Sequence, residues 1–170
     1  MTAAVSDDGG RTTGDPREFS DGSATVLVSN RQDVPVDEDG LAGLATTALR
    51  GEDVEAFELS VSFVDVDEMS ELHAEYLGER GPTDVLSFPL EDVDGDGVRL
   101  LGDVVICPEF ASHNNDDLAG ELRLLIVHGV LHLLGHDHED EAGRAEMWAR
   151  QERYSGISVG PAGVSREAAR

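Results

Sequence analysis

The hydrophobic pattern of the chain is dominated by one stretch, ELRLLIVHGVLHLLGHDH, which runs from Glu121 to His138. Nine of the fifteen residues from Glu121 to Gly135 are aliphatic, and they fall on every side of a helical wheel. A helix that is apolar on all sides is enclosed by the rest of its domain. The pattern therefore predicts a central buried helix.

Shorter periodic segments surround this helix. Alternating apolar residues predict half-buried strands, and apolar residues three or four positions apart predict helices. The predicted strands are Ala24–Asn30, Phe57–Val64, Asp84–Leu90 and Leu100–Cys107, and the predicted helices are Asp37–Arg50, Val66–Leu77, a turn from Pro108 to Phe110, the central helix from about Asp117, and Glu139–Tyr154. This order predicts an α+β fold with a mixed four-stranded sheet packed with about five helices.

Two polar segments bound this pattern. Residues 1–23 are rich in Gly, Asp, Ser and Thr, and we expect a disordered tail there. Residues 155–170 are rich in Gly, Ser and Ala, and we expect a loose C-terminal tail. Residues 24–154 are then a single domain, long enough to bury a core.

An acidic loop, EDVDGDG, joins the last two predicted strands. Positions 1, 3, 5, 6 and 12 of a calcium-binding loop are matched by Asp92, Asp94, Asp96, Gly97 and Asp103. However, both flanks are predicted strands, and Arg99 occupies a position at which an aliphatic residue is expected. We interpret the segment as a hairpin loop.

The net charge is −24, and all twelve basic residues are arginine. The two tails hold four arginines and six acids, which leaves eight arginines against thirty acids in residues 24–154. Such a surface repels polyanions over about 10 Å at 0.1 M salt. It argues against a nuclease with a broad basic groove.

The cellular compartment is predicted from three observations. Cys107 is the only cysteine, so no intrachain disulfide can form. No stretch approaches 18 consecutive apolar residues, and the N-terminus does not have the pattern of a secretory signal. We expect a cytoplasmic protein that does not associate with a membrane.

Two histidines of the central helix predict a metal site. His128 and His132 are spaced i and i+4, which places them about 40° apart on one face. Gly135 is a typical helix-ending residue, and His138 follows three positions later. Three imidazoles with an open fourth position are typical of catalytic zinc. Nickel, copper or iron could bind the same set in vitro.

Some assignments around this site stay open. His136 is a rival third ligand, but it directly follows Gly135, where the chain is still turning, so we prefer His138. Asp137 could orient a ligand imidazole from outside the metal shell, or it could cap the following helix. Metzincin proteases share the histidine spacing, HExxHxxGxxH, but their general base is replaced here by Gly129. Peptide hydrolysis by that mechanism is therefore not expected.

Three sequence blocks together resemble a known family. HGVLHLLGHDH is similar to the HGxLHLxGxDH signature of the YbeY family, zinc-dependent endoribonucleases of bacterial ribosomal RNA maturation. GPTDVLSFP at residues 81–89 and LGDVVICP at residues 101–108 resemble two further blocks of that family. The resemblance implies one Zn²⁺ per chain, with His128, His132 and His138 as its ligands.

The resemblance also implies an activity. It is single-strand-specific cleavage of an RNA phosphodiester near the 3′ end of 16S ribosomal RNA, in late processing and ribosome quality control. The implied partners are ribosomal RNA, the ribosome and a ribosomal protein, not DNA. Because the surface is strongly acidic, either the chain is adapted to high salt, or a ribosomal or other protein partner delivers it to the RNA. A zinc-bound water is the expected reacting group, with support from Asp137 or Arg80. The nucleophile stays open between that water and the RNA 2′-hydroxyl.

The chain departs from the family in the helix before the second block. Leu77 follows Tyr76 where many members have an arginine, and His73 replaces an asparagine. Arg80 could take over phosphate binding, or it could be an ordinary arginine of a surface loop. His136 replaces the usual tyrosine.

Three residues of the second block, Thr83, Asp84 and Ser87, are candidate substrate-binding residues, although turn and strand roles explain Asp84 and Ser87 equally well. Two other functions are compatible with the same residues. One is a zinc hydrolase of another substrate class, and the other is a non-enzymatic ribosome-assembly factor with a structural metal.

Overall fold

The computed structural model describes residues 16–137 and 139–157. His138, the predicted third ligand, lies outside the described residues, as do most of the two predicted tails.

A single mixed sheet organises the fold. Its strands are β1 (Arg17–Asp21), β2 (Ala24–Arg31), β3 (Phe57–Val64), β4 (Val85–Val93) and β5 (Arg99–Ile106), in the order β1-β2-β3-β5-β4. β2, β3 and β5 run parallel, and β1 and β4 lie antiparallel at the two edges. The predicted α+β class is confirmed.

The prediction of four strands was wrong by one, because β1 falls in the segment that was assigned to the N-terminal tail. β1 is a short polar strand, REFSD, that has only Phe19 as a large apolar residue. It is held by its pairing with β2 through the turn at Gly22 and Ser23, where Gly22 has φ +69°. Two-residue hairpin turns favour a glycine with positive φ. The pair Gly22-Ser23 between two extended segments was the available signal for this hairpin.

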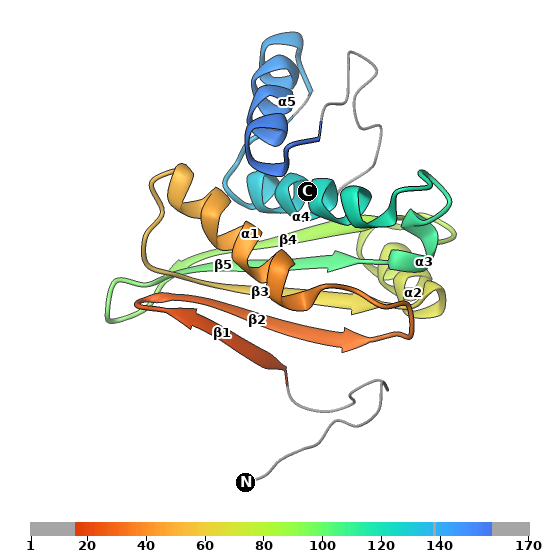
Figure 1. Ribbon diagram of the computed structural model, residues 1–170, viewed down its shortest axis with the longest axis horizontal. Coiled ribbons are helices and arrows are strands. Elements are labelled where there is room, and N and C mark those ends of the chain that lie inside the picture. Colours follow the sequence, from red (N-terminus) through yellow and green to blue (C-terminus); the bar gives the residue numbers. More distant parts are fainter. Residues whose placement is uncertain (1–15, 138, 158–170) are drawn as a thin grey trace, which may run out of the picture.

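Within the described part of the chain, five helices pack around the sheet, in agreement with the prediction. They are α1 (Glu38–Gly51), α2 (Val66–Leu77), α3 (Pro108–Ala111), α4 (Leu118–Leu133) and α5 (Glu141–Ser155). α1 and α4 contribute to the core on one face of the sheet, and α2 packs on the other face. α5 lies on α4, on the side away from the sheet (Figure 1). None of the helices in residues 16–137 and 139–157 is both long and apolar enough to cross a membrane.

Helix α4 is the predicted central helix, and twelve of its sixteen residues are buried. It is enclosed by β4 and β5, by α1 and by α5. Each of the four longer helices begins with an aspartate that accepts a backbone N–H three residues later: Asp37, Asp65, Asp117 and Asp140. Part of the acidity of this chain is therefore used to cap helices.

The acidic loop is a hairpin, as we interpreted it. β4 and β5 pair antiparallel on both sides of it, and the Asp94 carboxylate accepts the backbone N–H groups of Asp96 and Val98. Asp103 lies within β5, opposite Phe88, and so stands apart from the turn.

Gly129 brings α4 close to the sheet. A Cβ atom at this position would lie 2.6 Å from Val104 Cγ1 and 3.3 Å from Ser87 Oγ. The Ser87 hydroxyl donates to the Gly129 carbonyl at 3.3 Å. Contacts shorter than 3 Å cannot be accommodated without movement, so a side chain here would push the helix away from β4 and β5.

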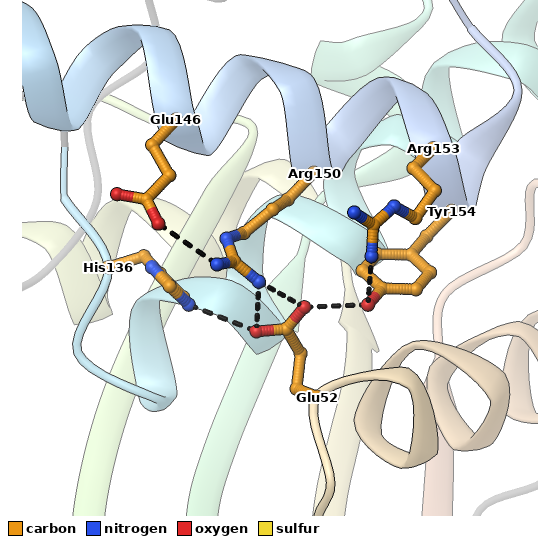
Figure 2. A network of polar contacts seen from close by, with 6 residues as sticks. All are labelled: Glu52, His136, Glu146, Arg150, Arg153 and Tyr154. Atoms are coloured by element: carbon orange, nitrogen blue, oxygen red, sulfur yellow. Dashed lines mark hydrogen bonds and ion pairs between the residues drawn. The ribbon is translucent and has the colours of Figure 1, made fainter.

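Glu52, directly after α1, fastens α5 to the body of the protein (Figure 2). Its side chain is 7% exposed and accepts hydrogen bonds from Arg150 at 2.6 and 2.7 Å and from the Tyr154 hydroxyl at 2.6 Å. His136 Nε2 lies 3.2 Å from the same carboxylate. Burial raises the pKa of Glu52, but hydrogen bonds from Tyr154, Arg150 and His136 outweigh it, so the pKa lies below that of an ordinary glutamate.

We predict that Gly129→Ala lowers the free energy of unfolding by about 1–3 kcal/mol, because the added methyl group overpacks the contact between α4 and β5. Urea unfolding measures this change. Gly43→Ala is the matched control, since Gly43 is also helical but has nothing within 4 Å of an added Cβ. Alanine there should be neutral or stabilising by up to about 1 kcal/mol. Equal effects of the two substitutions would contradict the close contact.

We predict that Glu52→Gln lowers the free energy of unfolding by about 1–3 kcal/mol at pH 7. A carboxyl whose pKa is lowered in the folded state contributes stability above its unfolded pKa, about 4.3, and loses it as the pH falls through the folded pKa. The difference between wild type and variant should therefore shrink below about pH 4. Urea unfolding of metal-free protein at pH 7 and pH 3.5 measures it.

Glu55→Gln is the control for this prediction. Glu55 is exposed and makes one long contact, 3.6 Å, with Arg50. Its substitution should change the free energy of unfolding by less than about 1 kcal/mol. A difference between wild type and Glu52→Gln that stays constant across this pH range would show that the Glu52 charge does not hold α5.

Candidate metal centre

His128 and His132 project from the C-terminal half of α4, one turn apart, as their spacing predicted. Their ring centroids are 4.7 Å apart, and the ring planes are inclined at 68°. His128 is 1% exposed, His132 is partly buried, and the Nε2 atoms of both rings are shielded from solvent. The structure therefore brings the first two predicted ligands together in a dry part of the domain.

The second ring nitrogen of His128 is held by α5. Its Nδ1 lies 2.5 Å from Oε1 of Gln151, a fully buried residue. An amide oxygen can only accept a hydrogen bond, so Nδ1 carries the proton and Nε2 carries the lone pair. Metal-ligating histidines usually make such a bond with their other nitrogen.

Gln151 was missed by the sequence analysis. The buried residues of α5 are Met147, Gln151 and Ser155, which repeat every four positions. A glutamine on the inner stripe of an amphipathic helix was the available signal, because buried amides require hydrogen-bond partners.

The chain reverses direction directly after α4, as Gly135 predicted. Gly135 has φ +99°, its N–H donates to the His132 carbonyl at 3.0 Å, and the His136 N–H donates to the Leu131 carbonyl at 3.1 Å. This pair of bonds is a Schellman motif, which ends helices at a glycine. The third ligand, His138, lies two residues beyond this motif and stays a prediction.

The two neighbours of His138 in this loop have other contacts. The ring of His136 points to Glu52, with Nε2 3.2 Å from the carboxylate (Figure 2). This contact supports His138 over His136 as the third ligand. Asp137 accepts the backbone N–H of Glu139 at 3.2 Å, while Asp140 is the residue that caps α5.

The described residues fit a zinc ion as far as they extend. Within residues 16–137 and 139–157, no group of three or more His, Cys, Asp or Glu side chains is placed to hold a metal. The described pair consists of two adjacent imidazoles, one of them oriented by an acceptor on its second nitrogen. Neutral imidazoles of this kind suit zinc.

The three candidate substrate-binding residues are all buried. Ser87 contacts Gly129, the residue that follows His128 in the sequence, through its hydroxyl group. Asp84 accepts a hydrogen bond from the Asn114 side chain at 3.1 Å, and its carbonyl accepts the Cys107 N–H at 3.0 Å. Thr83 is buried beside it. These contacts give Asp84 and Ser87 structural roles, in joining β4 to the segment before α4 and in seating α4 on the sheet.

Arg80 lies in the exposed loop after α2. It makes no hydrogen bond or ion pair with any described residue, and the loop is held by His73, whose Nδ1 donates to the Gly81 carbonyl at 2.8 Å. Leu77, which stands where many family members have an arginine, packs against the apolar cluster beneath α2. Leu77 therefore has a packing role in this chain.

Comparisons with known proteins show which family this chain resembles. The family described as Endoribonuclease YbeY matches residues 27–156. The Endoribonuclease YbeY of Nocardia farcinica is 39% identical over 142 residues, which cover 76% of this chain and 77% of that protein. The protein of the same name from Frankia casuarinae is 44% identical over 141 residues, covering 74% of this chain and 70% of that protein.

A solved structure is also similar. The solution structure of a protein from Thermotoga maritima superposes with a TM-score of 0.50 at 28% identity, and the match covers 76% of this chain and 86% of that one. The family match over residues 27–156 includes α4, its histidine pair and the following loop. From the extent and identity of these matches we conclude that the chain belongs to the Endoribonuclease YbeY family.

Proposed function

We propose that this protein is a zinc-dependent endoribonuclease that cuts single-stranded ribosomal RNA near the 3′ end of 16S ribosomal RNA, in late processing and ribosome quality control. The observation that carries the proposal is the adjacent pair of the buried His128 and the partly buried His132, with Gln151 on the second nitrogen of His128, in a chain of this family. His138 would complete the ligand set.

Each described residue has a distinct task in this proposal. His128 and His132 would hold the ion. Zinc in such a site supplies a more acidic water and polarises a phosphate oxygen. Gly129 excludes a protease-type glutamate base, because even a Cβ would collide with Val104. The nucleophile is then water or the RNA 2′-hydroxyl, and the absence or presence of a 2′,3′-cyclic phosphate on the fragments separates the two.

The charges support delivery to RNA by a partner. Four described arginines, Arg17, Arg31, Arg50 and Arg150, are paired with carboxylates. Among the residues that the structure describes, those without an ion pair are Arg80, Arg99, Arg123, Arg144 and Arg153. Five scattered arginines on a chain of net charge −24 give few phosphate contacts. We therefore propose the cytoplasmic ribosome, with one of its proteins, as the partner that supplies affinity.

We predict that the protein cuts ribosomal RNA within ribosomes more efficiently than the naked RNA, and that a zinc chelator abolishes cleavage. His132→Ala should lower the rate at least about 100-fold, because removing a metal ligand or its support typically costs a factor of 10–100 or more. The rate at which fragments appear at the mapped cut sites measures all three effects.

The matched control is His113→Ala, which removes an exposed imidazole from the segment between α3 and α4 and should leave cleavage unchanged. A folded His132→Ala protein that cuts as fast as wild type would overturn the zinc mechanism. If wild type and His132→Ala both support ribosome maturation without cutting RNA, the role of a non-enzymatic assembly factor would replace the proposed one.

A further inference from the structure

Gln151 has a contact that the proposed chemistry does not yet explain. Its side chain is fully buried, its Oε1 is 2.5 Å from His128 Nδ1, and it comes from a different helix, α5. We propose that Gln151 is a positioning residue that holds His128 in the one tautomer able to bind zinc through Nε2. This inference rests on the zinc site proposed above.

The orientation of the amide decides the tautomer of His128. With Oε1 towards the ring, Nδ1 must carry the proton, and Nε2 presents its lone pair. The reverse orientation would direct an amide N–H at Nδ1, and the ring proton would then sit on Nε2. A proton on Nε2 would prevent that atom from binding a metal. The two orientations therefore correspond to a competent and an incompetent ligand.

The observed orientation has a cost. Gln151 Nε2 is buried and finds no hydrogen-bond acceptor among the residues that the structure describes. An unsatisfied buried donor is destabilising, and an apolar side chain of similar size would avoid this loss. A buried group of this kind therefore calls for an explanation. The contact with a candidate metal ligand is the function that this site offers.

The fold keeps the amide in place. Met147, one turn before Gln151, is fully buried, and the Ser155 hydroxyl donates to the Gln151 backbone carbonyl at 2.6 Å. The adjacent Arg150 fastens α5 to Glu52, as does Tyr154 (Figure 2). A locked helix and a locked side chain leave the ring of His128 little freedom to turn. The network around Glu52 thus supports the metal site from a distance.

The zinc affinity of four proteins tests the inference, by competition with a chromophoric chelator at pH 7.5. Gln151→Leu should bind zinc about 10–100-fold more weakly than wild type, the usual effect of losing such a partner. Gln151→Glu keeps an acceptor at the same position and should bind at least as tightly as wild type. Gln32→Leu is the matched control, because Gln32 is also buried but bonds to Asn30 and Val34. It should leave zinc affinity unchanged.

A second measurement needs no variant. Long-range ¹H–¹⁵N NMR of metal-free wild type reports which nitrogen of His128 carries the proton, and we expect Nδ1. Gln151→Leu should shift the ring towards a mixture of tautomers.

The outcomes are separable from those of the proposed function. A wild type that binds no zinc would overturn the metal site and this inference together. Zinc binding by wild type with an unchanged affinity in folded Gln151→Leu would overturn the inference alone. A proton on Nε2 in metal-free wild type would overturn it too, even if the leucine variant does not fold.

Discussion

The burial of α4 is the constraint on which the rest of the structure depends. A helix with apolar residues on all sides must be covered on all sides, and here the sheet, α1 and α5 cover it. The same enclosure surrounds two imidazoles that could not stay buried without polar partners. Gln151 provides such a partner for His128, and Gly129 lets the helix approach the sheet closely enough to seal it. The contacts that bury α4 therefore also place its two histidines.

Helix α5 covers α4 although few of its own residues are apolar and buried. Its sequence is mostly polar, and only Met147, Gln151 and Ser155 are buried. It contributes little apolar surface and is held instead by the charged network around Glu52 (Figure 2). His136 joins the same carboxylate, so the network connects α1, α5 and the loop that leads to His138. His136, which replaces the usual tyrosine of the family signature, thus makes a polar contact that holds this loop.

Much of this arrangement could be predicted from local sequence patterns. The bounds of β3 and α2, the burial of α4 and the turn at Gly135 all follow from periodicity and from glycine conformation. The strand β1 was missed because four polar residues and a single phenylalanine carry no periodic signal until β2 pairs with them. Gln151 was missed because its partner, His128, is 23 positions away in the sequence. Glu52 was missed because its partner Arg150 is 98 positions away. Such partners are chosen by the tertiary fold, which a local pattern does not describe.

The proposed zinc site requires that α4 and the loop after it offer three imidazoles to one zinc ion and leave a fourth position open. X-ray absorption spectroscopy at the zinc edge of the zinc-loaded protein tests this claim most directly. The account predicts three imidazole nitrogens and one further light atom at about 2.0–2.1 Å from the metal. A shell of four imidazoles, or a sulfur from Cys107 at about 2.3 Å, would identify a closed structural site and contradict it.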